Sequence, residues 1–203
     1  MPVWQALQEE LGPKGFTVIT VALDRSPDDA RQWIEKANPT HPSLIDTEFR
    51  LADLYGMVNV PTIVWIDEAG KIVRPNDVAF ATDTYKAITN FDSGKSLAAI
   101  RAWVRGEAKT LSPEVIRARQ ALPTPAHQQA RAEFGLARWL YNQGQLEAAS
   151  RHFGEAERLA PQDWTIRRGS MLMRKMDPFG DDFRSRRTAW VNAGNAYYLP
   201  LPD

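Results

Sequence analysis

The sequence contains no cysteine among its 203 residues. This absence excludes disulfide bonds, thiolate catalysis and zinc–thiolate sites within the chain. Cysteine usage often indicates the cellular compartment of a protein, because disulfides persist mainly in oxidising surroundings. A chain without cysteine gives no such indication. A function that needs a reactive thiol therefore cannot be performed by these residues alone.

Histidine is also scarce, and His41, His127 and His152 lie far apart without the spacing of metal ligands. We therefore expect neither a metal ion nor a cofactor. The sequence shows no Ser/His/Asp spacing typical of a catalytic triad. A cysteine-independent enzyme thus has no group of residues to support it, and whether the chain is an enzyme stays open.

No apolar run approaches the roughly 18 residues that a membrane-spanning helix needs. The first fifteen residues, MPVWQALQEELGPKG, are amphipathic and acidic, and they lack the basic start and apolar stretch of a signal peptide. The sequence as it stands therefore predicts a cytoplasmic protein without a membrane span. A missing N-terminal signal would make an extracytoplasmic location possible.

The charges balance, with 25 Lys and Arg against 25 Asp and Glu. Basic residues gather between positions 167 and 187, but Asp177, Asp181 and Asp182 interrupt them. Such a mixture is typical of a solvated helix face, whereas a nucleic-acid surface carries an excess of positive charge. We expect protein or peptide partners and no nucleic acid.

Residues 1–106 alternate between helical and strand patterns. The predicted helices cover residues 4–11, 26–37, 47–56 and 97–104, and the predicted strands cover residues 16–23, 41–45, 60–66 and 71–74. This alternation predicts an α/β layer sandwich with helices on both faces. The hairpin at 63–73 would make its sheet mixed.

After a linker at 106–112, only helical patterns remain. The predicted helices cover residues 113–122, 124–143, 146–159, 162–176 and 182–196. We therefore predict two domains, 1–106 and 112–203. The final segment 196–203 (AYYLPLPD) carries exposed aromatic residues, for which we expect docking on the helical domain or on a partner.

Residues 130–163 follow the spacing of a tetratricopeptide repeat. The positions that match are Leu136, Ala137, Gly144, Ala149, Phe153, Ala156 and Pro161. Small alanines would let two antiparallel helices approach closely, a phenylalanine would fill the groove between them, and the proline would end the second helix. The alternative is a plain helical hairpin. A repeat of this kind is an interaction scaffold that performs no chemistry.

Val60, Pro61 and Thr62 place a proline at the head of a predicted buried strand, where proline removes a hydrogen-bond donor. A trans proline at a strand edge is one explanation. The position also resembles the cis-proline of thioredoxin-fold proteins, which are known to keep this bond cis in a tight turn. That resemblance implies that the backbone beside Pro61 pairs with an extended substrate peptide.

The neighbouring sequence supports the resemblance. Residues 15–24 (GFTVITVALD) and 46–73 (DTEFRLADLYGMVNVPTIVWIDEAGKIV) resemble thiol–disulfide oxidoreductases of the TlpA/ResA type and their redoxin relatives. The resemblance covers about residues 1–105 and is most specific at 44–74. It implies a thioredoxin-like domain and a role in redox homeostasis of the cell.

In that family a strand leads into W-C-x-x-C and a helix. Residues 1–7 (MPVWQAL) resemble the continuation of this helix. The resemblance therefore implies that the first strand and the cysteine motif would lie upstream of Met1. Loss of that strand would expose a sheet edge, and an exposed edge recruits other chains. We expect self-association through this edge.

These observations leave two hypotheses. The first is a thioredoxin-like protein related to thiol–disulfide oxidoreductases, redox-inactive because it has no cysteine and retaining Val60, Pro61 and Thr62 as a docking loop. The second is a non-catalytic binding module that uses the same loop together with the tetratricopeptide-like helices.

Overall fold

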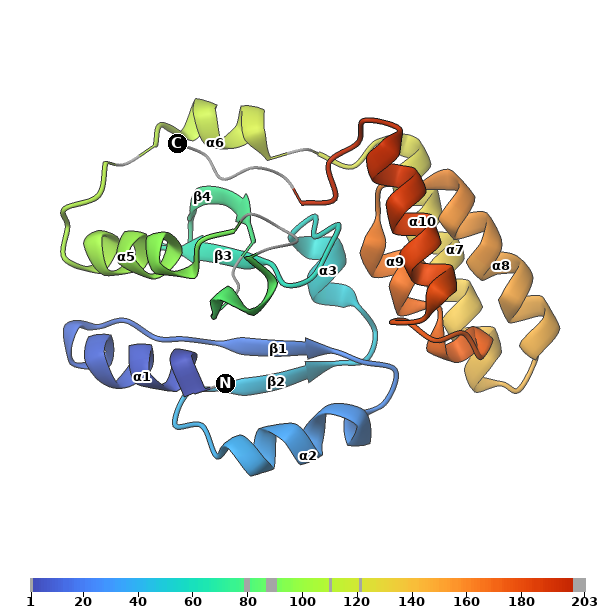
Figure 1. Cartoon of the computed structure of the whole chain (residues 1–203), viewed down its shortest axis with the longest axis horizontal. Helices are drawn as coiled ribbons and strands as arrows, with labels where there is room; N and C mark the ends of the chain where they lie inside the picture. Colours follow the sequence, from blue (N-terminus) through green and yellow to red (C-terminus); the bar gives the residue numbers. More distant parts are fainter. Residues whose placement is uncertain (1, 79–80, 87–90, 110, 121, 199–203) are drawn as a thin grey trace. The chain divides into compact units, whose positions relative to one another are not determined.

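A computed structural model describes residues 2–78, 81–86, 91–109, 111–120 and 122–198 (Figure 1). The chain forms two compact units. The α/β unit comprises Met1–Thr47 and Pro61–Ala118, and the helical unit comprises Glu48–Val60 and Arg119–Asp203. Residues 48–60 thus pack with the C-terminal helices, whereas the sequence assigned them to the first domain. The domains 1–106 and 112–203 themselves stay a prediction.

The α/β unit alternates helices and strands, as the sequence predicts. Its elements are α1 (Pro2–Leu11), β1 (Thr20–Leu23), α2 (Pro27–Ala37), β2 (Ser43–Asp46), β3 (Ile63–Ile66), β4 (Ile72–Asp77), α5 (Ser93–Val104) and α6 (Pro113–Arg119). Short 3₁₀ turns occupy Gly12–Lys14 and Asp83–Tyr85. The mixed α/β class is therefore confirmed.

The strands form two small sheets, which differs from the single mixed sheet that the sequence predicts. β1 and β2 pair in parallel, from Thr20 opposite Ser43 to Leu23 opposite Asp46. β3 and β4 pair antiparallel with irregular register. Among the described residues no strand pairing joins the two sheets, so β1 and β3 each have a single strand neighbour. Each sheet therefore keeps unpaired strand edges.

β1 begins four residues later than the predicted strand at 16–23. The amide of Phe16 donates to the Leu11 carbonyl, and the amide of Val18 donates to the Gln8 side chain at 2.7 Å. Both bonds tie this backbone to the end of α1. The residues before Thr20 therefore serve as a connection to the helix rather than as part of the ladder.

The core of the α/β unit lies between α1, β3 and α5. Leu7, Leu11, Trp65 and Ile100 are buried there, and Trp103 packs on Trp65 with ring centroids 5.0 Å apart. The leucines are four positions apart in α1 and so share one helix face. Burial of this face fixes both helices against the hairpin strand.

The helical unit contains α3 (Arg50–Leu54), α7 (Pro125–Asn142), α8 (Leu146–Leu159), α9 (Trp164–Gly169), a 3₁₀ turn (Leu172–Arg174) and α10 (Asp181–Asn192). α8 has the predicted bounds. The predicted helix at 162–176 is shorter in the structure, because Asp163 caps its start and the Ser170 hydroxyl bonds the Arg167 carbonyl at its end. None of the described helices has the length and apolar character needed to cross a lipid bilayer.

α7 and α8 form a helical hairpin and lie side by side in Figure 1. Gly144 makes the turn between them with a φ of 75°, a conformation that side chains disfavour. Phe153 is fully buried and meets Phe134 edge to face, with centroids 5.6 Å apart. The interface between α7 and α8 therefore consists of two closely packed helices with the Phe153 ring buried between them.

Replacing Phe153 with alanine should lower the free energy of unfolding by about 3–5 kcal/mol, because the substitution leaves a cavity in this interface. Urea unfolding followed by circular dichroism measures the change. Trp139→Ala on the exposed face of α7 is the matched control and should cost much less. Equal effects of the two substitutions would contradict the interface described here.

Candidate functional site

The Val60–Pro61–Thr62 loop leads directly into β3. Because β3 begins at Ile63, Pro61 stands before the first paired residue and its missing amide costs no ladder bond. Val60 is 37% exposed, and Pro61 and Thr62 are half-buried. The amide of Val60 donates to the side-chain oxygen of Asn59 at 2.9 Å. This bond holds the backbone at the start of the loop.

The residues before the loop are held by the C-terminal helices. The amide of Trp164 donates to the Val58 carbonyl, and the Arg131 guanidinium donates to the Met57 carbonyl at 2.8 Å. Both contacts lie within the helical unit. The conformation of the backbone just ahead of Val60 therefore depends on residues far later in the chain, 74 positions away for Arg131 and Met57.

A buried carboxylate organises this part of the unit. Asp163 is fully buried, and its side chain accepts from the amides of Thr165 and Ile166 at the start of α9. Its other oxygen accepts from Arg131 and from His127 Nε2, which lies 2.7 Å away. A hydrogen bond from His127 to this oxygen uses the tautomer with hydrogen on Nε2. Both oxygens of the buried Asp163 carboxylate thus accept hydrogen bonds.

Phe49 locks α3 into the same unit. Its φ of 58° is unusual for a bulky residue. Because Phe49 has this conformation, the helix begins at Arg50 rather than at the predicted residue 47. The side chain is buried, meets Phe134 edge to face at 5.2 Å and lies against Gly169, where an added Cβ would approach its ring to 3.0 Å. Burial of this ring offsets the cost of the backbone conformation.

The C-terminal segment docks on the helical unit, which is one of its two predicted destinations. Tyr197 lies 4.8 Å from Trp164 between ring centroids, and Arg187 lies over the Tyr197 ring. Asn59 donates to the Tyr197 carbonyl at 2.8 Å. Residues 199–203 lie outside the described part of the chain.

The predicted repeat positions have different surroundings. Ala137, Ala149, Phe153 and Ala156 are buried in the hairpin, whereas Leu136 is 43% exposed and Gly144 and Pro161 are exposed. The sequence analysis missed two buried residues of α7, Ala130 and Phe134. They lie four positions apart, and this spacing was the available signal. Their repeat-packing role stays a prediction.

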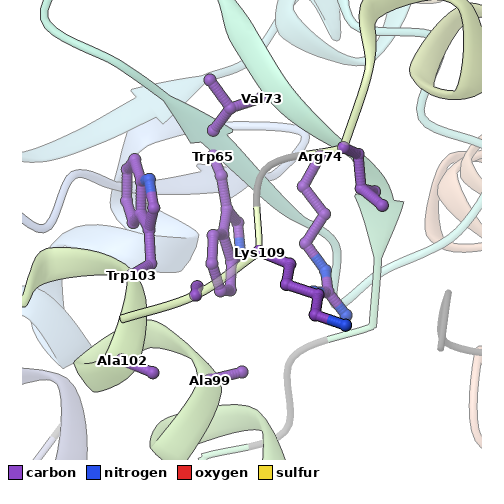
Figure 2. A pocket seen from close by; sticks show the side chains of 9 residues that line it. Trp65, Val73, Arg74, Ala99, Ala102, Trp103 and Lys109 are labelled. Atoms are coloured by element: carbon purple, nitrogen blue, oxygen red, sulfur yellow. The ribbon is translucent and has the colours of Figure 1, made fainter. Parts of the chain in front are cut away.

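The α/β unit has a cavity of about 250 Å³ (Figure 2). Its lining includes Trp65, Trp103, Arg74 and Lys109, with the Arg74 guanidinium 5.0 Å from the centre of the Trp65 ring. Arg74 also pairs with the buried Asp77, and burial raises the pKa of that carboxyl. The Arg74 charge is thus engaged within the chain by the Trp65 ring and the Asp77 carboxyl.

The three histidines lie in different surroundings. His41 and His127 are buried, and His152 pairs with Glu133 at 2.6 Å. Within the described ranges, no three histidine or acidic side chains are grouped as metal ligands. His127 instead belongs to the Asp163 network.

The comparisons with known proteins concern the first part of the chain. Residues 1–74 match the AhpC/TSA family. The match covers 74 of 203 residues and supports a relation to thioredoxin-like redoxins. It includes Val60, Pro61 and Thr62 and ends in β4. No curated protein and no solved structure matches the chain.

Asp163→Asn should lower the free energy of unfolding by about 3–5 kcal/mol, because it removes the buried charge partner of Arg131 and leaves only the partly exposed Asp53. Urea unfolding at neutral pH measures the loss. Asp181→Asn, at a fully exposed side chain at the start of α10, should change stability by less than about 0.5 kcal/mol. A tolerated Asp163→Asn would show that the network contributes little.

Proposed function

We propose that the chain is a thioredoxin-like protein of the TlpA/ResA type that performs no thiol–disulfide turnover by itself and binds extended peptides at Val60, Pro61 and Thr62. The observation that carries this proposal is the redoxin-family match over residues 1–74 in a chain without cysteine. Thiol–disulfide exchange needs an attacking thiolate, and this chain supplies none. Peptide docking needs only backbone groups and a suitable surface.

The local geometry supports docking at this loop. Val60 is partly exposed and is separated from β3 by Pro61 and Thr62, and the Pro61 nitrogen cannot donate a hydrogen bond. An incoming extended segment would place a donor at the Val60 carbonyl, because the Val60 amide already donates to Asn59. The cis form of the Val60–Pro61 bond, taken from the family resemblance, belongs to the same proposal.

The helical unit would supply a second interaction surface. The buried small residues Ala137, Ala149 and Ala156 support a tetratricopeptide-like packing of α7 on α8. Such hairpins present their outer faces to protein partners. In this arrangement the chain is a binding protein with a docking loop and a helical scaffold.

Two assays test the proposal. In insulin reduction with dithiothreitol, the chain should give no acceleration, and thioredoxin serves as the positive control. Turnover would contradict redox inactivity. Fluorescein-labelled, S-carboxymethylated insulin B chain provides an extended peptide, and fluorescence anisotropy measures its binding.

Pro61→Ala should weaken binding of the labelled B chain several-fold, because the loop backbone gains freedom that binding must remove. Pro125→Ala, at the first residue of α7, is the matched control and should leave binding unchanged. Absence of B-chain binding to every variant would overturn the docking proposal.

We also propose that the chain self-associates through an unpaired edge of its small sheets. Ile19 directly precedes β1 and is 60% exposed. In sedimentation velocity at micromolar concentrations, the sedimentation coefficient should rise with concentration. Ile19→Lys should reduce the rise, because charge at a strand edge opposes pairing.

Leu54→Lys, at an exposed position of α3 in the helical unit, is the control for self-association and should behave as the unsubstituted chain does. A monodisperse monomer at all concentrations would contradict association through the sheet edge.

A further inference from the structure

The C-terminal segment contacts the backbone that the proposed function assigns to peptide docking. The Tyr198 hydroxyl donates to the Val60 carbonyl at 3.3 Å, and the Asn59 side chain donates to the Tyr197 carbonyl at 2.8 Å. The side-chain oxygen of Asn59 accepts from the Val60 amide. One asparagine therefore links the docking residue to the tail.

Aromatic contacts hold the segment in this position. The Trp190 indole donates to the Ala196 carbonyl at 3.0 Å, and the Tyr197 ring meets Trp164 edge to face. Arg187 covers the Tyr197 ring at 4.8 Å. All these residues belong to the helical unit, so the contacts form within one compact body.

The Tyr198 hydroxyl carries its proton at neutral pH and can therefore donate a hydrogen bond. Burial raises the pKa of Tyr198 well above its ordinary value, so the hydroxyl keeps its proton throughout the neutral and mildly alkaline range. The Tyr198 ring also contacts Tyr197, with centroids 4.7 Å apart. Both tyrosines are nevertheless half-exposed, which makes their contacts weaker than those of the buried core.

We propose that Ala196–Tyr198 is an intramolecular occupant of Asn59 and Val60 and that a peptide must displace it to bond the Val60 carbonyl. This inference rests on the proposed function, because it assumes that Val60 is the docking residue. Only chains in which the loop is free can bind peptide. The apparent affinity for peptide is therefore the intrinsic affinity multiplied by the fraction of such chains. The tail is thus an autoinhibitory contact.

The occupant also indicates the chemistry of the displacing partner. A competing segment would place a donor at the Val60 carbonyl, a carbonyl at the Asn59 amide and an aromatic ring on Trp164. An extended peptide with a tyrosine or another aromatic residue meets these three requirements. We infer that aromatic extended segments are favoured over aliphatic ones.

The test uses the full chain and the labelled, S-carboxymethylated insulin B chain. Tyr198→Phe removes only the hydroxyl and should raise the affinity for this peptide about two- to fivefold. The double variant Tyr197→Ala with Tyr198→Ala removes the aromatic anchors and should raise it further, to about tenfold or more. Tyr141→Phe, on α7, is the matched control and should not change the affinity.

Hydrogen exchange of residues 57–60, followed by mass spectrometry, reports on the tail without added peptide. Release of the tail in the double variant should speed exchange there, while circular dichroism stays unchanged. Faster exchange together with tighter peptide binding supports the proposal.

The remaining outcomes separate the two proposals. Equal peptide affinity in all variants would overturn the autoinhibitory contact and leave the docking function standing. No peptide binding by any variant, even with faster exchange at 57–60, would overturn docking at Val60 and the autoinhibitory contact with it.

Discussion

The buried carboxylate of Asp163 joins three parts of the helical unit. It caps α9 through backbone amides, and it accepts from His127 and Arg131 of α7. Arg131 in turn reaches the Met57 carbonyl and Asp53 of the segment 48–60. A buried charge is costly unless its partners are all present, so these elements must assemble together.

Through these contacts the helices hold the backbone next to Val60, the proposed docking residue. Val60 is the last residue of the segment 48–60, and Pro61 begins the other unit. Arg131 and Trp164 hold the backbone before Val60, and Tyr198 contacts the carbonyl of Val60 itself. Val60, which the family resemblance assigns to a thioredoxin-like domain, is therefore contacted by residues outside that resemblance.

Local patterns predicted much of the secondary structure. Gly144 and Pro161 predicted the bounds of α8, and Pro27 and Asn38 predicted the bounds of α2 to within one residue. The errors arose where distant contacts compete with local preference. β1 is short because Gln8 and Leu11 bond the preceding backbone, and α3 is late because the Phe49 ring is buried against Phe134.

The sequence by itself determined the absence of thiol chemistry, the alternation of helices and strands before residue 106, and the helical character of the later residues. These properties depend on composition and on local periodicity, which a single chain displays directly. Only the tertiary structure decided that 48–60 packs with the C-terminal helices and that Tyr198 meets Val60. Such contacts join residues far apart in the chain, and their partners are set by burial and charge pairing in three dimensions rather than by any local pattern.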